Sequence, residues 1–346
     1  MKILLLHEMS GVHTELRDGL LKIGVNAKIA TFGNLVRAYP TDIYIGREGK
    51  GATANLERLF LQLRNIKYFN QFDVIQTISP NPFYRPISAL VEKLVLNQGK
   101  KYIYVAAGSD AIYRKNVRNL EYFPPHDWFE RGNRYKKCCE FVANFSDIIP
   151  VCWEYKYCMQ KAGFSTSDIV PFPVNINNHR IKHNLGRKIK FFHPINRDPD
   201  LPFDIKGTKI IKKVFEELEN KYSKHAEFIM QGNLSHSDYS SLTDNVDVIV
   251  DQTYSYTYGM SAVYGMAKGK VVLSGMEPIA RETGHYRDCP IINIKPDKLD
   301  IAQKIEMLIQ NRLDIKRIAE ESRSFAEKYH NHISVAKIFA EIYSKR

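Results

Sequence analysis

Residues 247–275 of the 346-residue chain read DVIVDQTYSYTYGMSAVYGMAKGKVVLSG. The segments 246–251 and 270–274 are short apolar runs, as expected for strands that are buried on both faces of a sheet. Between them, a loop rich in Tyr, Ser and Thr passes through Gly259 into a helical stretch of small residues at 260–267. This order of strand, loop, helix and strand is typical of a parallel sheet covered by helices.

The same alternation extends through the whole chain. Strands are predicted at residues 2–7, 27–32, 72–78, 101–106, 147–151, 189–193, 227–231, 246–251 and 270–274. Helices are predicted at residues 12–23, 87–97, 134–145, 154–162, 208–218 and 260–267, and helical periodicity dominates residues 299–346. Two consecutive strand–helix series predict an α/β protein with two doubly wound, Rossmann-like domains.

The boundaries between these domains follow from one break in the pattern. Residues 1–175 are expected to form the N-terminal domain, and the polar, basic segment 176–188 is expected to be a linker. Residues 189–325 then form the C-terminal domain. The length of 346 residues also favours two domains over one.

Composition narrows the class of protein. Hydrophobic residues make up 44% and charged residues 25% of the chain, which is typical of globular proteins. No apolar run approaches the ~20 residues of a membrane-spanning helix, so a cytoplasmic protein is expected. The five cysteines are odd in number and lack metal-ligand spacing, which predicts inert thiols.

The net charge of +12 is the other informative bulk property. It predicts an anionic partner, which could be nucleic acid, an acidic membrane surface or a phosphorylated substrate. Because the basic residues are spread along the chain, ordinary solvated loops and helix faces explain them equally well. No recognised nucleic-acid-binding motif is present, so nucleic acid is not expected as a partner.

The loop at residues 193–208 carries two cations next to a predicted helix start. Arg197 and Lys206 precede Thr208, where the helix is expected to begin. Two cations beside a helix N-terminus favour binding of a diphosphate, since both the charges and the helix dipole attract anions. The alternative is that Arg197 pairs with an aspartate of the same loop on the surface.

Together, these two stretches resemble the C-terminal half of the GT-B glycosyltransferases, particularly glycosyltransferase family 4. The matching features are an Arg…Lys-Gly-Thr loop at residues 197–208, Asp251-Gln252, Tyr258-Gly259 and Met-Ala-x-Gly at residues 266–269. The resemblance covers residues 189–346 and is fainter over 1–175. It implies a GT-B architecture, in which the last helix, here residues 326–346, often crosses back to the N-terminal domain.

The resemblance implies a donor site in the C-terminal domain. The residues expected to line it are Arg197, Lys206, Gly207, Gly232, Tyr256, Thr257, Tyr258, Gly259, Met260, Ser261 and Tyr264. The chain departs from the family at the usual pair of glutamates separated by seven residues, which match Tyr256 and Tyr264. Tyrosine forms hydrogen bonds but is uncharged at neutral pH. Glu277, after the next strand, is a hypothetical replacement for the missing carboxylate.

Candidate catalytic residues in the N-terminal domain are less specific. Asp110 ends a predicted buried strand, where its carboxylate would orient or deprotonate an acceptor hydroxyl, or else cap a helix. His13 follows the first strand and has either a chemical role or a place at a helix start. The aromatic run at residues 122–129 would stack on a sugar ring or pack as a loop.

The resemblance implies sugar transfer from a nucleoside diphosphate sugar to a glycan or lipid-linked acceptor, as in cell-surface polysaccharide biosynthesis. It implies retention of configuration without a metal, with Arg197 and Lys206 stabilising the leaving diphosphate. The positive charge is compatible with peripheral contact at the inner face of a membrane. A GT-B nucleotide-sugar epimerase and a non-catalytic sugar- or nucleotide-binding protein remain alternatives.

Overall fold

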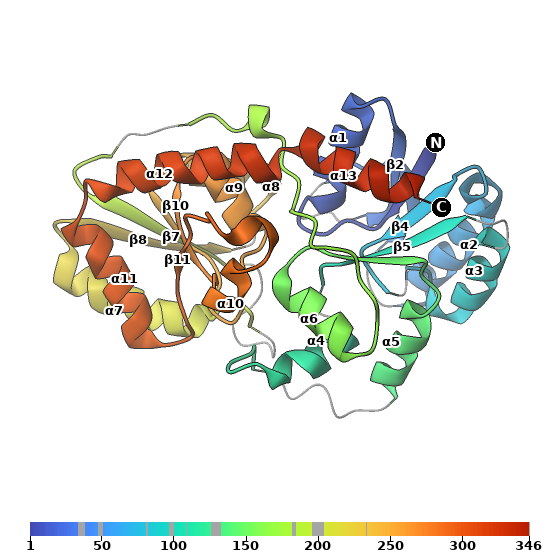
Figure 1. Ribbon diagram of the computed structural model, residues 1–346, viewed down its shortest axis with the longest axis horizontal. Coiled ribbons are helices and arrows are strands. Elements are labelled where there is room, and N and C mark those ends of the chain that lie inside the picture. The colour runs from blue at the N-terminus through green and yellow to red at the C-terminus, as the bar shows by residue number, and fades with distance from the viewer. Residues whose placement is uncertain are drawn as a thin grey trace. The chain divides into compact units, whose positions relative to one another are not determined.

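The computed structural model describes residues 1–33, 39–47, 51–80, 82–96, 100–108, 110–125, 133–181, 185–195, 204–232 and 234–345. The chain divides into two compact units (Figure 1). Unit 1 comprises Met1–Asn116, Arg131–Asn175 and His332–Arg346. Unit 2 comprises Val117–Glu130 and Ile176–Asn331. Both units are α/β structures built on parallel sheets, as the alternating pattern predicted.

Unit 1 contains a six-stranded parallel sheet in the order β3-β2-β1-β4-β5-β6. Its strands are β1 (Lys2–Leu6), β2 (Asn26–Gly33), β3 (Ile43–Arg47), β4 (Val74–Thr77), β5 (Lys101–Ala106) and β6 (Asp147–Pro150). The side chains of β1 and β4 are almost entirely buried, because helices cover both faces of the sheet.

The helices of unit 1 follow these strands in turn. They are α1 (Val12–Lys22), α2 (Ala52–Phe69), α3 (Ser88–Leu96), α4 (Ala111–Asn116), α5 (Arg134–Val142), α6 (Trp153–Lys161) and α13 (His332–Ser344). The core between helices and sheet is apolar and includes Leu4, Ile75, Tyr104 and Val142. Strand β3 and helices α2 and α4 had no counterpart among the predicted elements.

The C-terminal helix α13 packs on α1 within unit 1. A Cβ atom at Gly19 of α1 would lie 2.2 Å from the carbonyl oxygen of His332, so only glycine permits this close approach. The Tyr343 hydroxyl donates a 2.7 Å hydrogen bond to Oε1 of the buried Gln76. The end of the chain is therefore held by both packing and a buried polar contact.

Unit 2 contains a five-stranded parallel sheet in the order β11-β10-β9-β7-β8. Its strands are β7 (Ile189–Ile195), β8 (Ala226–Gly232), β9 (Val248–Val250), β10 (Val271–Ser274) and β11 (Ile292–Asn293). Its helices are α7 (Thr208–Tyr222), α8 (His236–Asp244), α9 (Met260–Ala267), α10 (Pro278–Arg281), α11 (Lys298–Gln310) and α12 (Asp314–Phe325). Among the described residues, no helix is both long and apolar enough to cross a membrane.

Residues 117–130 lie in the sequence between α4 and α5 of unit 1 but belong to unit 2 by their contacts. The segment begins with a short 3₁₀ turn, Val117–Asn119. Its described part ends at Pro125. No periodicity in the sequence indicated that this segment belongs to unit 2.

Candidate functional site

The strand order of unit 2 determines where a ligand site is expected. Strand β7 lies between β8 and β9, so the chain leaves β7 in one direction and later returns on its other side. In open parallel sheets, ligands bind outside the carboxyl ends of the strands at this reversal point. The loops that follow β7 and β9 carry Lys206 and Asp251, respectively.

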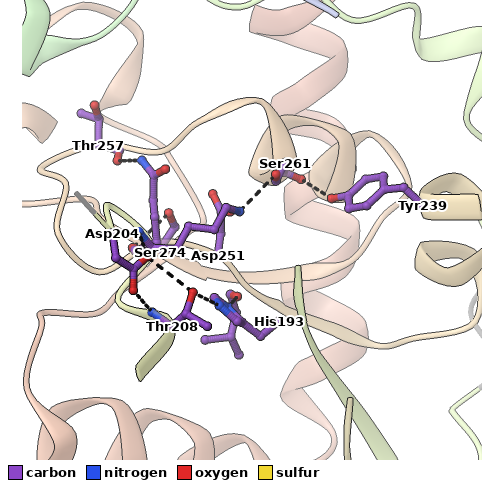
Figure 2. Close-up of polar contacts among 11 residues, drawn as sticks. His193, Asp204, Thr208, Tyr239, Asp251, Thr257, Ser261 and Ser274 are labelled. Carbon is purple, nitrogen blue, oxygen red and sulfur yellow. Dashed lines mark hydrogen bonds and ion pairs between the residues drawn. The ribbon is translucent and has the colours of Figure 1, made fainter. Parts of the chain in front are cut away.

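At this point Lys206 forms a buried ion pair with Asp251, which is labelled in Figure 2. The Nζ atom of Lys206 contacts Oδ1 of Asp251 and lies 3.3 Å from the Ser261 hydroxyl. Lys206 is 5% and Asp251 1% exposed, so neither charge is stabilised by bulk water. Each requires the other, because an unpaired buried charge is costly. The pair therefore fixes a positive charge beside Ser261.

Ser261 lies in the first turn of α9, so the Lys206 charge is held at the N-terminus of this helix. The N-cap residue of α9, Gly259, has extended backbone angles and offers no side chain to cap the helix. The first N–H groups of a helix lack intrahelical partners, and the helix dipole favours anions near them. A cation next to an uncapped helix N-terminus is suited to bind a phosphate group.

The N-terminus of α7, expected from the sequence to bind the anion, is instead capped by the protein. Asp204 accepts hydrogen bonds from the backbone N–H groups of Thr208 at 2.6 Å and Lys206 at 3.2 Å. Gly207, between them, has a φ of 69°, and a Cβ there would lie 2.2 Å from Oγ1 of Thr253. The Asp204 carboxylate thus already satisfies the first N–H group of α7, whereas α9 has no side-chain cap and is the other candidate helix for an anion.

His193 is hydrogen-bonded to both Val250 of β9 and Thr208 of α7. Its Nδ1–H donates to the carbonyl of Val250 at 2.7 Å, and Nε2 accepts from the Thr208 hydroxyl at 3.0 Å. Burial, with a contribution from the nearby Lys206 charge, lowers the pKa of His193 to about 3. The imidazole is therefore neutral at physiological pH and serves to join β7, β9 and α7.

This lowered pKa predicts a pH-dependent stability. The folded state keeps His193 neutral while the unfolded chain binds a proton below pH ~6.5, so stability is lost as pH falls from ~6.5 towards 3. We expect His193→Gln to reduce the slope of unfolding free energy against pH by up to about 1.4 kcal/mol per pH unit. Urea titrations at pH 7, 6 and 5 measure this slope. The exposed His225→Gln is the control, and equal slopes in both variants would contradict the assignment.

A second polar cluster surrounds Glu277, which follows β10. Oε1 of Glu277 accepts hydrogen bonds from Nδ2 of Asn293 at 2.7 Å and from the Tyr122 hydroxyl at 2.9 Å. Oε2 lies 3.8 Å from Nζ of Lys295. Because β10 and β11 are parallel neighbours, Glu277, Asn293 and Lys295 all lie at the carboxyl edge of the sheet. This edge thus holds a buried carboxylate beside a half-exposed cation.

Tyr256 connects this cluster to the segment 117–125. Its hydroxyl accepts a 3.0 Å hydrogen bond from the backbone N–H of Glu121, and its ring centroid lies 4.8 Å from that of Tyr122. The backbone N–H of Glu277 donates to the carbonyl of Tyr256 at 3.0 Å. Tyr122 thus packs on the protein in this structure. The part of the predicted aromatic run at residues 126–129 lies outside the described residues.

The loop between β9 and α9 is held by its own buried polar groups. The carbonyl of Thr257 accepts from Nε2 of Gln252 at 2.9 Å. The Tyr258 hydroxyl bonds to Nε2 of His330 at 2.8 Å, so this side chain joins the loop to the segment after α12. These contacts give Thr257 and Tyr258 a structural role in positioning α9.

The remaining predicted donor residues are spread over the same edge. Tyr264 lies in α9 with its ring 5.5 Å from that of His179, and Met260 is buried at the start of α9. Gly232 ends β8, where a Cβ would lie 3.0 Å from the Ile195 side chain. Arg197 lies outside the described residues, and its expected diphosphate contact stays a prediction.

The two catalytic candidates of unit 1 make structural contacts. Asp110 caps α4, with Oδ1 accepting from the Tyr113 N–H at 2.8 Å and Oδ2 accepting from the Tyr104 hydroxyl. His13 is fully buried, with Nδ1 bonded to the His7 carbonyl at 2.7 Å and Nε2 3.2 Å from Nε2 of Gln76. Burial lowers the pKa of His13 to about 4. The capping and packing interpretations account for these contacts.

Some residues of the site were not among the predicted ones. Asn293 and Lys295 follow a strand of two residues, too short to be recognised from its pattern. Asp251 was part of the family motif, but nothing in the sequence indicated its pairing with Lys206. No three His, Cys, Asp or Glu side chains of the described chain gather in a way that could hold a metal ion.

Comparison with known proteins gives no match in sequence but clear matches in structure. No protein-family model and no curated protein sequence matches the chain. Anabaena HepE in complex with UDP and glucose aligns over 100% of both chains, with a TM-score of 0.67 and 15% identity. Sucrose-phosphate synthase from Thermosynechococcus elongatus aligns over 99% of this chain and 98% of its own, with a TM-score of 0.65 and 11% identity.

A putative UDP-N-acetylglucosamine 2-epimerase from Listeria monocytogenes is also similar, with a TM-score of 0.57 and 11% identity over 99% of this chain and 96% of its own. At identities this low, the similarity establishes the fold alone. The chain has two Rossmann-like domains with parallel sheets, and its fold matches that of GT-B glycosyltransferases, as the sequence predicted.

Proposed function

We propose that this protein transfers a sugar from a nucleoside diphosphate sugar to an acceptor hydroxyl, with the donor bound by unit 2. One observation carries the proposal, namely the buried Lys206 charge at the uncapped N-terminus of α9, where the strand order reverses. A donor diphosphate would accept hydrogen bonds from the first N–H groups of α9 and from Nζ of Lys206. Arg197 is proposed as a further cation on this group.

The same contacts would assist departure of the diphosphate. When the bond between the anomeric carbon and the diphosphate oxygen breaks, negative charge grows on the leaving group. Lys206 and α9 are already oriented by Asp251, Ser261 and the surrounding loop, so they stabilise this charge without rearrangement. The acceptor oxygen forms the new bond to the anomeric carbon, and its proton passes to the departing diphosphate oxygen. We therefore expect turnover without an added metal ion.

The sugar ring is proposed to lie between α9 and Glu277. The Glu277 carboxylate accepts from Asn293 and Tyr122 in the structure, and a sugar hydroxyl would compete with Tyr122 for Oε1. Oδ2 of Asp251 is buried and has no hydrogen-bond partner among the described residues, so it remains available to a donor hydroxyl. These two carboxylates would take the role of the family's glutamate pair, whose positions are occupied by Tyr256 and Tyr264 in this chain.

For the acceptor, we propose a glycan or a lipid-linked intermediate of polysaccharide biosynthesis, with retention of configuration. The support is the resemblance of residues 189–346 to family 4. Product stereochemistry determined by NMR tests the mechanism, and inversion would contradict retention.

Product analysis tests the proposed function against its rivals. The full chain is incubated with UDP-, GDP-, ADP- and TDP-sugars, with and without a mixture of glycan acceptors, and the sugars are followed by NMR. We expect one donor to release its nucleoside diphosphate faster when an acceptor is present. An epimerised donor without an acceptor would favour the epimerase, and binding without any conversion would favour a non-catalytic protein.

A further inference from the structure

Helices α2 and α3 of unit 1 present an apolar face outward. Figure 1 shows the two helices side by side, in agreement with their direct contacts. The exposed side chains are Leu56 (64%), Phe60 (63%), Leu63 (40%), Leu90 (50%) and Leu94 (45%). On α2 they recur at intervals of four and three residues, and on α3 at an interval of four, so each set forms one stripe. Such a grouping differs from the single exposed apolar residues that most surfaces carry.

The exposed charges of these two helices are mostly positive. Arg64 and Lys67 of α2 and Lys93 of α3 are exposed next to the apolar stripes. The acidic residues of the two helices do not form ion pairs with these three cations among the described contacts. Glu57 pairs with Arg47, and Glu92 is buried with a hydrogen bond from Ser88. The outward face therefore combines large apolar side chains with three exposed cations, and the one partly exposed carboxylate of the two helices, that of Glu57, is paired with Arg47.

We propose that this face, formed by Leu56, Phe60, Leu63, Leu90, Leu94 and the three flanking cations, docks unit 1 on an anionic lipid membrane. Helices that lie in a membrane interface place apolar side chains at the acyl boundary and basic side chains among the headgroups. Anionic headgroups attract clustered Lys and Arg at short range. Both features are present on α2 and α3, and neither depends on the proposed sugar transfer.

The charge argues against a second copy of the chain as the occupant. Two copies that met through this face would bring like charges together, and each chain carries a net charge of +12. An anionic surface relieves this repulsion instead. The lipid surface is therefore the occupant that matches both the apolar and the charged part of the face.

Vesicle co-sedimentation of the full chain tests the proposal at physiological ionic strength. The probes are vesicles of phosphatidylcholine alone and vesicles in which about one third of the lipid is phosphatidylglycerol. We expect the protein to sediment with the anionic vesicles and to stay in solution with the neutral ones. Equal binding to both, or binding to neither, would overturn the proposal.

The apolar contribution is tested with a triple variant and a matched control. The face variant is Leu56→Gln/Phe60→Gln/Leu63→Gln, and the control changes exposed apolar residues of unit 2 as Ile279→Gln/Leu299→Gln/Leu313→Gln. All six positions are exposed, so both variants are expected to fold, which circular dichroism verifies. We expect the face variant to lose at least about tenfold in vesicle partitioning and the control to keep wild-type partitioning.

The charged contribution is tested in the same way. The face variant is Arg64→Glu/Lys67→Glu/Lys93→Glu, and the control, with the same net charge, is Lys213→Glu/Lys224→Glu/Lys316→Glu. We expect about a hundredfold weaker partitioning for the face variant, because each cation near the surface contributes about fivefold. Equal losses in both variants would show attraction by net charge alone and overturn the proposal. A wild-type dimer that the apolar variant dissociates would assign the face to a second copy instead.

Discussion

Replacement of Asp251 by alanine is expected to lower the free energy of unfolding by about 3–5 kcal/mol. The substitution leaves the Lys206 ammonium group buried without its counter-charge, and of its contacts with the described residues the hydrogen bond to the Ser261 hydroxyl remains. Water cannot compensate, since Lys206 is 5% exposed. Lys206→Ala is expected to destabilise the folded state for the same reason, because it leaves the Asp251 carboxylate buried without a counter-charge.

Urea denaturation followed by circular dichroism measures this effect. The control is Asp168→Ala, which removes the carboxylate of the exposed pair with Lys156 and is expected to cost at most about 1 kcal/mol. The double variant Lys206→Met/Asp251→Leu removes both charges and should recover much of the lost stability. If Asp251→Ala unfolds within about 1 kcal/mol of the wild type, the ion pair is not buried as described.

Substitution of Glu277 by glutamine is expected to lower the turnover of the donor sugar by about a hundredfold or more. Glutamine has nearly the same shape and its amide oxygen can still accept from Asn293, so the local fold should remain. What is lost is the negative charge beside the proposed sugar position. We expect the loss mainly in kcat, because a charge that stabilises the transition state acts on the chemical step.

The matched control is Glu306→Gln on α11, where the carboxylate pairs with Lys221 on the surface. Its turnover should equal that of the wild type. Tyr122→Phe removes only the hydroxyl that competes for Oε1 of Glu277, and it should therefore leave kcat nearly unchanged. Wild-type turnover in Glu277→Gln would remove this residue from the proposed mechanism.

The architecture was predictable because buried parallel strands form apolar runs that the sequence shows directly. Helix α2 was not predicted, and its outward face gives the physical reason. Leu56, Phe60 and Leu63 are exposed, so the helix lacks the polar stripe by which an amphipathic surface helix is recognised. Gln62, in contrast, is buried, so polar and apolar residues do not separate onto two sides and the sequence shows no clear helical period.

The positions of the candidate residues in the fold were predictable from the sequence, but their contacts were not. The motif residues Lys206, Gly259 and Ser261 lie at one edge of the sheet, as the strand pattern implied. Which helix N-terminus lacks a cap depends on side-chain hydrogen bonds, and the cap that Asp204 forms on α7 cannot be distinguished in the sequence from an ion pair. The contacts of Tyr122 with Tyr256 and Glu277 join residues more than 130 positions apart, which no local pattern encodes.

Binding of a nucleoside diphosphate is the central claim, and a thermal-shift screen of the unmodified chain measures it most directly. The ligands are UDP, GDP, ADP, TDP and CMP, and the nucleoside of each is tested separately for comparison. A ligand specific for the folded state stabilises it by about 2.7 kcal/mol at a hundredfold excess over its Kd. We predict that one diphosphate raises the Tm and that its nucleoside does not, because Lys206 and α9 bind the phosphates. No shift with any diphosphate, or an equal shift with the nucleoside, would contradict the account.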